Sequence, residues 1–238
     1  MNILAFDTCL GAVSVAYRHR AADGSWATVE AFEERQTGQA ERLMPMLAGV
    51  LAEAGADFTR VQRVAVTLGP GTFTGVRTGI AAARAFRLAA GVDIVGVTSL
   101  AVIANGTAAG ARGGGMASGR PVLVAVDARR GHVYVQLFND GPRDPLRGPV
   151  EVTPEAALDM LDGLAASPLL VGSGARLVAE AAATRSMPFS MGPEHIEPHA
   201  SDLAEMAAGL QALTDVMPIY IRPPDAKPQT GKSLARAP

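Results

Sequence analysis

Two segments of this 238-residue chain repeat one pattern, and this repeat constrains the fold more than any other feature of the sequence. In each segment an apolar run ends in Asp, three spacer residues lead to Gly, and an alternating apolar run follows. The segments are residues 3–17, with Asp7 and Gly11, and residues 122–138, with Asp127 and Gly131. Apolar runs on both sides of a short turn predict a β-hairpin. Because each hairpin opens one half of the chain, we predict a duplicated unit.

The rest of each half alternates between helical and strand patterns. Apolar residues at helical spacing, such as Leu43, Leu47 and Leu51, predict a helix over about 40–54. Further helices are expected over residues 74–90 and from about 99, 154, 174 and 202, and strands over residues 27–34, 61–68, 92–97, 168–172 and 216–222. This order predicts an α/β protein with mixed sheets and helices on one or both faces.

Composition divides the chain further. Residues 106–119 are rich in Gly and Ala and lack periodicity, which indicates a linker or surface loop. Residues 223–238 are rich in Pro and polar residues, which indicates a loosely docked or disordered tail. We therefore expect a first lobe over residues 1–105 and a second over residues 120–222, with the last helix of the second lobe packed back on the first.

The overall balance of residues excludes several classes of protein. Hydrophobic residues make up 48% of the chain and charged residues 18%, so a sizeable core is expected. The formal net charge of −2 disfavours binding to nucleic acid by the chain alone. Cys9 is the only cysteine, which fits a reducing compartment. With neither a signal peptide nor a membrane span visible, we expect a cytoplasmic protein without a membrane partner.

The run GPGTFTGVRTG, residues 69–79, lies between a predicted strand and a predicted helix. It is neither a P-loop nor a dinucleotide fingerprint, because its glycines have the wrong spacing and no Gly-Lys-Ser/Thr closes it. Free N–H groups at the start of the helix make Gly69, Gly71 and Thr72 candidates for binding an anion or nucleotide. Close backbone packing is the alternative, and the residues by themselves favour it.

The hairpin aspartates also allow two interpretations. Asp7 and Thr8 are candidates for binding a nucleotide phosphate or its metal, since turns aim several N–H groups at one point. Alternatively, each Asp accepts a hydrogen bond from a backbone N–H group of its own turn. For Asp127 the second interpretation is favoured, because Arg129 and Arg130 stand where small polar residues would suit a phosphate. For Asp7 both interpretations remain open.

Five segments in this order resemble the bacterial TsaB (YeaZ-type) family. They are ILAFDTCLGAVSVAY, GPGTFTGVRTGIAAARAF, VGVTSLAVIA, VLVAVDARRGHVYVQLF and PIYIR, and the resemblance covers residues 2–222. That family is similar to the Kae1/TsaD (Gcp-like, peptidase M22-like) proteins and is their non-catalytic branch. The resemblance implies a two-lobed actin-like fold (ASKHA, ribonuclease H-like), with a degenerate second lobe.

The resemblance also implies a function. It is that of a non-catalytic subunit required for threonylcarbamoyl transfer to the adenosine 3′ of the anticodon, in tRNAs that read codons beginning with A. The implied partners are a TsaD-type catalytic paralogue, which the subunit activates, a TsaE-type ATPase, and tRNA through the complex. A homodimer is expected when the paralogue is missing. The resemblance implies no intrinsic cofactor and leaves open the binding of ATP or ADP at an interface of the complex.

The histidines of the chain fit the non-catalytic branch. The catalytic branch binds its metal through His-x-x-x-His on the first long helix, and the equivalent region here, Gln39 to Pro45, contains no histidine. His195 and His199 have a spacing of four, but Pro198 between them disfavours a helix that would present both to one metal. We therefore expect no metal site and no catalytic residues.

By resemblance, the helices over residues 40–54 and 74–90 form the interface with the paralogue. Both are apolar on more than one face, as expected for helices that bury two partners. The alternative is that each helix is sandwiched within its own lobe. The expected interface residues are Leu43, Met44, Leu47, Val50, Val76, Ile80 and Arg84.

Two other functions remain as alternatives. A small ATP-dependent kinase or ligase of the same superfamily would use Asp7 as a metal-linked acid, although the second half is short for a full nucleotide pocket. A metallopeptidase is the weakest alternative, because no helix carries paired histidines.

Overall fold

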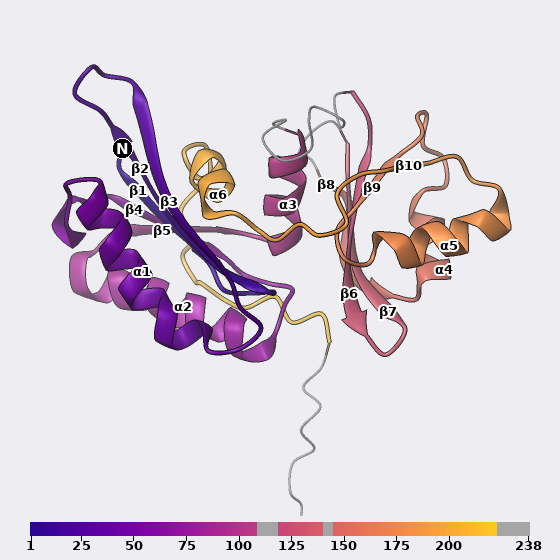
Figure 1. The fold of residues 1–238 in the computed structure, drawn as a ribbon, viewed down its shortest axis with the longest axis horizontal. Coiled ribbons are helices and arrows are strands. Elements are labelled where there is room, and N and C mark those ends of the chain that lie inside the picture. Colours follow the sequence, from indigo (N-terminus) through magenta and orange to yellow (C-terminus); the bar gives the residue numbers. More distant parts are fainter. Residues whose placement is uncertain (109–118, 140–144, 223–238) are drawn as a thin grey trace, which may run out of the picture.

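The computed structural model describes residues 1–108, 119–139 and 145–222. Two five-stranded sheets lie side by side, each covered by helices (Figure 1). The first sheet has the order β3-β2-β1-β4-β5 and the second the order β10-β9-β6-β7-β8. The strands of the first are β1 Ile3–Asp7, β2 Ala12–Arg20, β3 Trp26–Glu34, β4 Arg63–Thr67 and β5 Asp93–Val97. Those of the second are β6 Val122–Arg129, β7 His132–Phe138, β8 Pro145–Val152, β9 Leu169–Val171 and β10 Ser190–Met191.

The two sheets have the same topology. In each, the first three strands are antiparallel neighbours, and the fourth and fifth strands continue in parallel from the other side of the first. Each sheet also opens with the hairpin that the sequence repeats, β1–β2 and β6–β7. The predicted duplicated α/β fold is therefore confirmed, because the two sheets match in strand order and direction.

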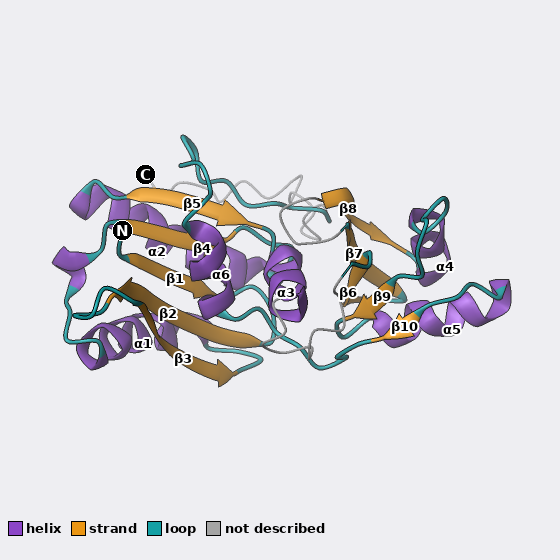
Figure 2. Ribbon diagram, turned by 90° about the horizontal axis from the view of Figure 1, so that it is seen from above, coloured by secondary structure: helices purple, strands orange, loops and turns teal. Residues whose placement is uncertain are grey.

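Helices cover both sheets on both faces (Figure 2). α1 (Gln39–Glu53) and α2 (Phe73–Ala90) cover the outer face of the first sheet, and α4 (Pro154–Ala157) and α5 (Ala175–Arg185) that of the second. Between the sheets lie α3 (Ser99–Ala108) and α6 (Ala200–Ala207). Single turns of 3₁₀ helix, η1 (Phe58–Arg60) and η2 (Leu158–Met160), complete the described elements.

The two inner helices are exchanged between the halves of the chain. α6 follows the strands of the second sheet but packs against β1, β2 and β4 of the first, whereas α3 follows the first sheet and packs against β6 and β7. Their apolar side chains join one cluster with residues of both sheets, including Leu100, Ile103, Leu203 and Met206. One shared apolar layer therefore connects the lobes.

Local sequence explains how α2 begins and ends. Thr72 caps its first turn, because its Oγ1 accepts a hydrogen bond from the Gly75 N–H group at 3.1 Å. Gly91 ends it with φ of 65°, a left-handed conformation that glycine adopts at little cost. Thr153 caps α4 in the same way.

Among the described residues, none of the helices combines the length and apolar character that a membrane crossing requires.

Some expected elements differ from the structure. Residues 216–222 do not form a strand, because Pro218 lacks an N–H group and the segment makes single backbone contacts, such as Ile219 N–H to Leu68 O at 2.7 Å. Residues 106–108, expected in the linker, end α3 instead. The remaining linker residues 109–118 and the tail, 223–238, lie outside the described residues. Strands β8 and β10 were not predicted.

Candidate functional site

The first hairpin places Asp7 and Thr8 inside the protein. The Asp7 side chain is fully buried and accepts hydrogen bonds from the Thr67 hydroxyl group and, at 3.2 Å, from the Cys9 N–H group. The Thr8 hydroxyl group donates to the Gly75 carbonyl oxygen at 2.6 Å. Both side chains therefore hold the turn and the adjacent loop in place.

The second hairpin has the same hydrogen bond from a turn N–H group to its Asp, although its turn is tighter. The Asp127 carboxylate accepts a hydrogen bond from the Arg129 N–H group at 2.7 Å, two residues on, as Asp7 does from Cys9. Arg129 and Arg130 both have positive φ, at 65° and 56°, so the turn is strained where the sequence has no glycine. Asp127 therefore accepts a hydrogen bond from its own turn, as the sequence favoured.

The glycine-rich loop packs directly on the first hairpin. The Thr72 N–H group donates to the Cys9 carbonyl oxygen at 2.7 Å. A Cβ atom at Gly71 would lie 2.2 Å from that oxygen, and one at Gly75 would lie 2.0 Å from the Thr8 carbonyl oxygen. Contacts this short exclude any side chain, so both glycines serve close backbone packing.

A cleft lies between the two hairpins. Its volume is about 410 Å³, and Gly11, Gly71, Thr72 and Asp127 line it from both lobes. Of the candidate nucleotide-binding residues, Gly71 and Thr72 therefore reach the cleft. Asp7, Thr8 and Gly69 are buried.

Glu197 was not predicted, yet it occupies this cleft. Its Oε2 atom accepts a hydrogen bond from the Gly11 N–H group at 2.9 Å, at the end of the first hairpin turn. Burial raises the pKa of the Glu197 carboxyl group, while the hydrogen bond from Gly11 opposes that shift. No local pattern could have revealed this contact, since the two residues lie 186 positions apart.

The two closely spaced histidines make different contacts. His199 stacks on Phe32, with ring centroids 4.2 Å apart, and its Nδ1 atom lies 3.3 Å from Glu30 Oε1. His195 lines the cleft, and both histidines line the pocket that adjoins it. Within residues 1–108, 119–139 and 145–222, no group of three or more His, Cys, Asp or Glu side chains is arranged to hold a metal ion.

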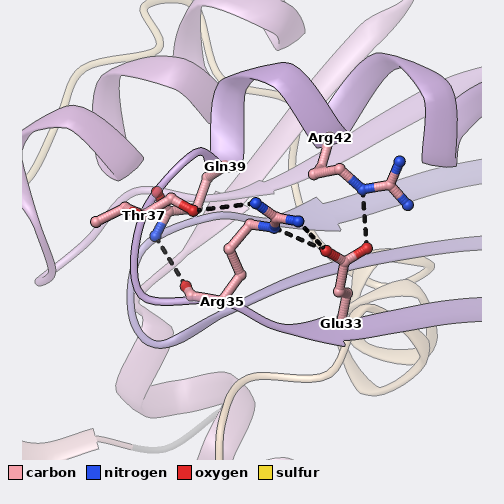
Figure 3. A network of polar contacts seen from close by, with 5 residues as sticks. All are labelled: Glu33, Arg35, Thr37, Gln39 and Arg42. Atoms are coloured by element: carbon pink, nitrogen blue, oxygen red, sulfur yellow. Dashed lines mark hydrogen bonds and ion pairs between the residues drawn. The ribbon is translucent and has the colours of Figure 1, made fainter.

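The start of α1 is built from polar contacts (Figure 3). Glu33 binds Arg35 and Arg42 through its two carboxylate oxygens, with distances of 2.6 and 2.8 Å. The Gln39 side-chain amide donates to the Arg35 carbonyl oxygen at 3.1 Å. One turn further, Leu43 is buried and apolar. The start of α1, from Gln39 to Leu43, is thus fixed by an amide and by packing.

The expected interface residues require a correction. Leu43, Leu47, Val50, Val76 and Ile80 are at most 4% exposed, because they form the core between α1, α2 and the first sheet. They are therefore not available to a partner. Arg84 donates to the Val216 carbonyl oxygen at 2.6 Å, and of the predicted apolar residues only Met44, 50% exposed, faces outward.

The outer surface of α1 and α2 consists mainly of small or apolar side chains. We call this surface the outer helix face. Leu88 is 90% exposed, the most among the large apolar side chains in the described part of the chain. The outer helix face comprises Met44, Pro45, Ala48, Gly49, Ala52, Ala81, Ala85 and Leu88, all exposed.

Comparison with known proteins decides the family. The model of the family described as "TsaD: tRNA N6-adenosine threonylcarbamoyltransferase" matches residues 33–211. The chain belongs to this family. An uncharacterized protein of Mycobacterium tuberculosis is 34% identical over 233 residues, which are 95% of this chain and 94% of the relative.

Further relatives identify the branch. The tRNA threonylcarbamoyladenosine biosynthesis protein TsaB of Escherichia coli is 39% identical over 135 residues, 56% of this chain and 53% of TsaB. The crystallised YeaZ from Pseudomonas aeruginosa has 27% identity and a TM-score of 0.73, over 92% of this chain and 99% of YeaZ. The predicted TsaB (YeaZ-type) resemblance is confirmed, and with it the actin-like fold.

The packing of the glycine-rich loop predicts opposite effects for two Gly-to-Ala changes in helices. Gly75→Ala should lower the free energy of unfolding by about 1–3 kcal/mol, because its methyl group meets the Thr8 carbonyl oxygen. Gly49→Ala, where a Cβ meets no atom within 4 Å, should raise it by about 0.5–1 kcal/mol. Urea unfolding of both variants measures the difference, and equal effects would contradict the packing role.

Burial of Asp7 predicts a pH dependence of stability. Desolvation raises the pKa of its carboxyl group from 3.8 to about 7, so the native state binds this proton more tightly than the unfolded chain. The contribution of this carboxyl group to the free energy of unfolding is therefore lost as the pH rises from about 4 to about 7. Unfolding of the wild type and Asp7→Asn across this range should show the wild type losing on the order of 4 kcal/mol relative to the variant. Parallel profiles would contradict it.

Proposed function

We propose that this chain is a non-catalytic subunit in the biosynthesis of threonylcarbamoyladenosine in tRNA, and that it acts by binding and activating a TsaD-type paralogue. The observation that carries this proposal is membership in the TsaB branch, combined with an α1 helix that lacks a histidine pair. Transfer of the threonylcarbamoyl group to the adenosine 3′ of the anticodon is then the work of the paralogue.

The outer helix face supports this role. α1 and α2 lie side by side on the outside of the first sheet. Between Met44 and Ala52 and between Ala81 and Leu88, the only exposed charged residue is Arg84, which donates to the Val216 carbonyl oxygen. Small side chains let two helix pairs approach closely, and Met44 and Leu88 add apolar area. A paralogue with the same fold presents two equivalent helices, so the two pairs would form a four-helix contact.

The other partners follow from this arrangement. A TsaE-type ATPase and tRNA would bind to the assembled complex, since the net charge of this chain is −2 and gives tRNA little attraction of its own. When the paralogue is absent, the outer helix face of a second copy can replace it and form a symmetric homodimer.

ATP or ADP, where the complex needs it, would bind at an interface of the complex. In this chain the Gly11 N–H group already donates to the Glu197 carboxylate, and Asp7 is sealed under the turn. The cleft also presents Asp127 and Glu197 to any phosphate that entered it, and Arg129, which pairs with Asp127 at 3.9 Å, offsets only part of their repulsion.

Reconstitution tests the proposed function. The paralogue, the TsaE-type ATPase, the enzyme that forms the adenylate, ATP, threonine, bicarbonate and unmodified tRNA are mixed with and without this chain. The modified nucleoside is quantified by mass spectrometry. We expect product only with the chain. Leu88→Glu should weaken binding to the paralogue tenfold or more, since it places a charge in an apolar contact.

Leu146→Glu provides the matched control. Leu146 is 43% exposed but lies on β8 in the second lobe, far from the outer helix face in Figure 1. Both variants should unfold at the wild-type temperature, because both positions are exposed. Equal product without the chain would refute the function, whereas normal binding of Leu88→Glu would refute only the surface.

Nucleotide binding has its own test. A fluorescent ADP analogue is titrated into the isolated chain, the isolated paralogue and their complex. We expect no saturable binding to the isolated chain. Saturable binding that is lost in Asp7→Ala would favour the kinase or ligase alternative instead.

A further inference from the structure

The segment that precedes the tail lies along α2 and is held by three arginines. We call residues 213–222 the strap. Arg87 donates to the carbonyl oxygens of Leu213 and Thr214, at 2.6 and 2.9 Å. Arg84 donates to the Val216 carbonyl oxygen at 2.6 Å. These carbonyl groups lie outside any described strand, so the guanidinium groups take the place of a neighbouring strand.

Apolar packing and further hydrogen bonds also hold the strap on the first lobe. Val216 is 2% exposed and belongs to the core beneath α2. Further along, the Arg77 guanidinium group lies 3.5 Å above the Phe73 ring and donates to the Tyr220 hydroxyl group at 2.7 Å. The Leu213 and Ile219 N–H groups donate to carbonyl oxygens of the first lobe. The strap is therefore fixed to the first lobe along its length.

The end of the strap contacts the other lobe. Arg222 Nε lies 3.0 Å from both carboxylate oxygens of Glu151, and its Nη2 atom contacts Glu151 Oε1. Glu151 belongs to β8, in the second sheet, where it pairs with Tyr134 of β7. The two side chains are only 25% and 14% exposed, so water screens this pair less than a surface pair.

The chain thus connects the lobes twice near its end. It leaves the second sheet after β10, packs α6 on the first sheet, follows α2 as the strap, and returns to the second sheet through Arg222. In Figure 1, α3 and α6 lie between the sheets, and the strap passes on the side where the β6–β7 hairpin ends. The apolar layer of α3 and α6 is one connection, and the Arg222–Glu151 pair is a separate one.

We propose that the strap is a tie between the lobes, which sets the opening of the cleft through the Arg222–Glu151 pair. The α2 arginines fix its start, and the ion pair fixes its end. A shared apolar layer resists separation of the sheets but resists rotation about itself less, because the hydrophobic effect is not directional. A bidentate ion pair has a preferred geometry. Because this pair lies away from the apolar layer, a small rotation of the lobes would separate its atoms, and the pair therefore restricts such a rotation.

The distance between the lobes in the isolated chain tests the tie. Spin labels are attached to Glu53→Cys on α1 and Glu180→Cys on α5, two exposed positions on the outer helices of the two sheets. Cys9 is fully buried, so it does not compete for the label. Pulsed electron paramagnetic resonance then gives the distribution of distances between the labels.

Three variants of this labelled protein decide the outcome. Arg222→Glu should shift the distribution to longer distances and broaden it, and the exchange Arg222→Glu with Glu151→Arg should restore it. Arg185→Glu is the control, because it breaks an ion pair with Asp159 that lies within the second lobe. It should leave the distribution unchanged. A folded Arg222→Glu protein with the parent distribution overturns the proposal, as does a folded charge exchange that fails to restore it.

Discussion

The apolar layer between the two sheets is the constraint on which the rest of the structure depends. It consists of α3, which follows the first sheet and packs on the second, and α6, which follows the second and packs on the first. Neither lobe can bury its inner face without the helix of the other. Because the layer holds the two sheets together, the two hairpin turns come to lie on either side of one cleft.

Each hairpin turn retains the same Asp-to-backbone hydrogen bond, but their surroundings differ. Around Asp7 the glycine-rich loop closes so tightly that its backbone is within packing distance of Thr8 and Cys9. Around Asp127 the turn stays open to the cleft, with arginines at positive φ. The carboxylate of Glu197 then uses the Gly11 N–H group that borders the cleft. Both hairpins are therefore retained, but their polar groups form hydrogen bonds within the protein.

The outer helices divide their apolar residues between two tasks. The larger ones, such as Leu47 and Ile80, fill the core of the first lobe. The outward residues are mostly small, which leaves a smooth surface suited to another pair of helices. Two arginines of α2, Arg84 and Arg87, bind the strap. The same helix therefore contributes to the core, the outer helix face and the tie.

The sequence by itself determined the repeat, the α/β class, most strands and helices, and the family, because these follow from local periodicity, turn residues and motifs. It also favoured packing for the glycine-rich loop, which the contacts of Gly71 and Gly75 bear out. Only the tertiary structure decided which apolar residues of α1 and α2 face the core, since both helices are apolar on more than one face. It alone brought Glu197 to Gly11 and Arg222 to Glu151, because contacts between residues far apart in the chain leave no local pattern.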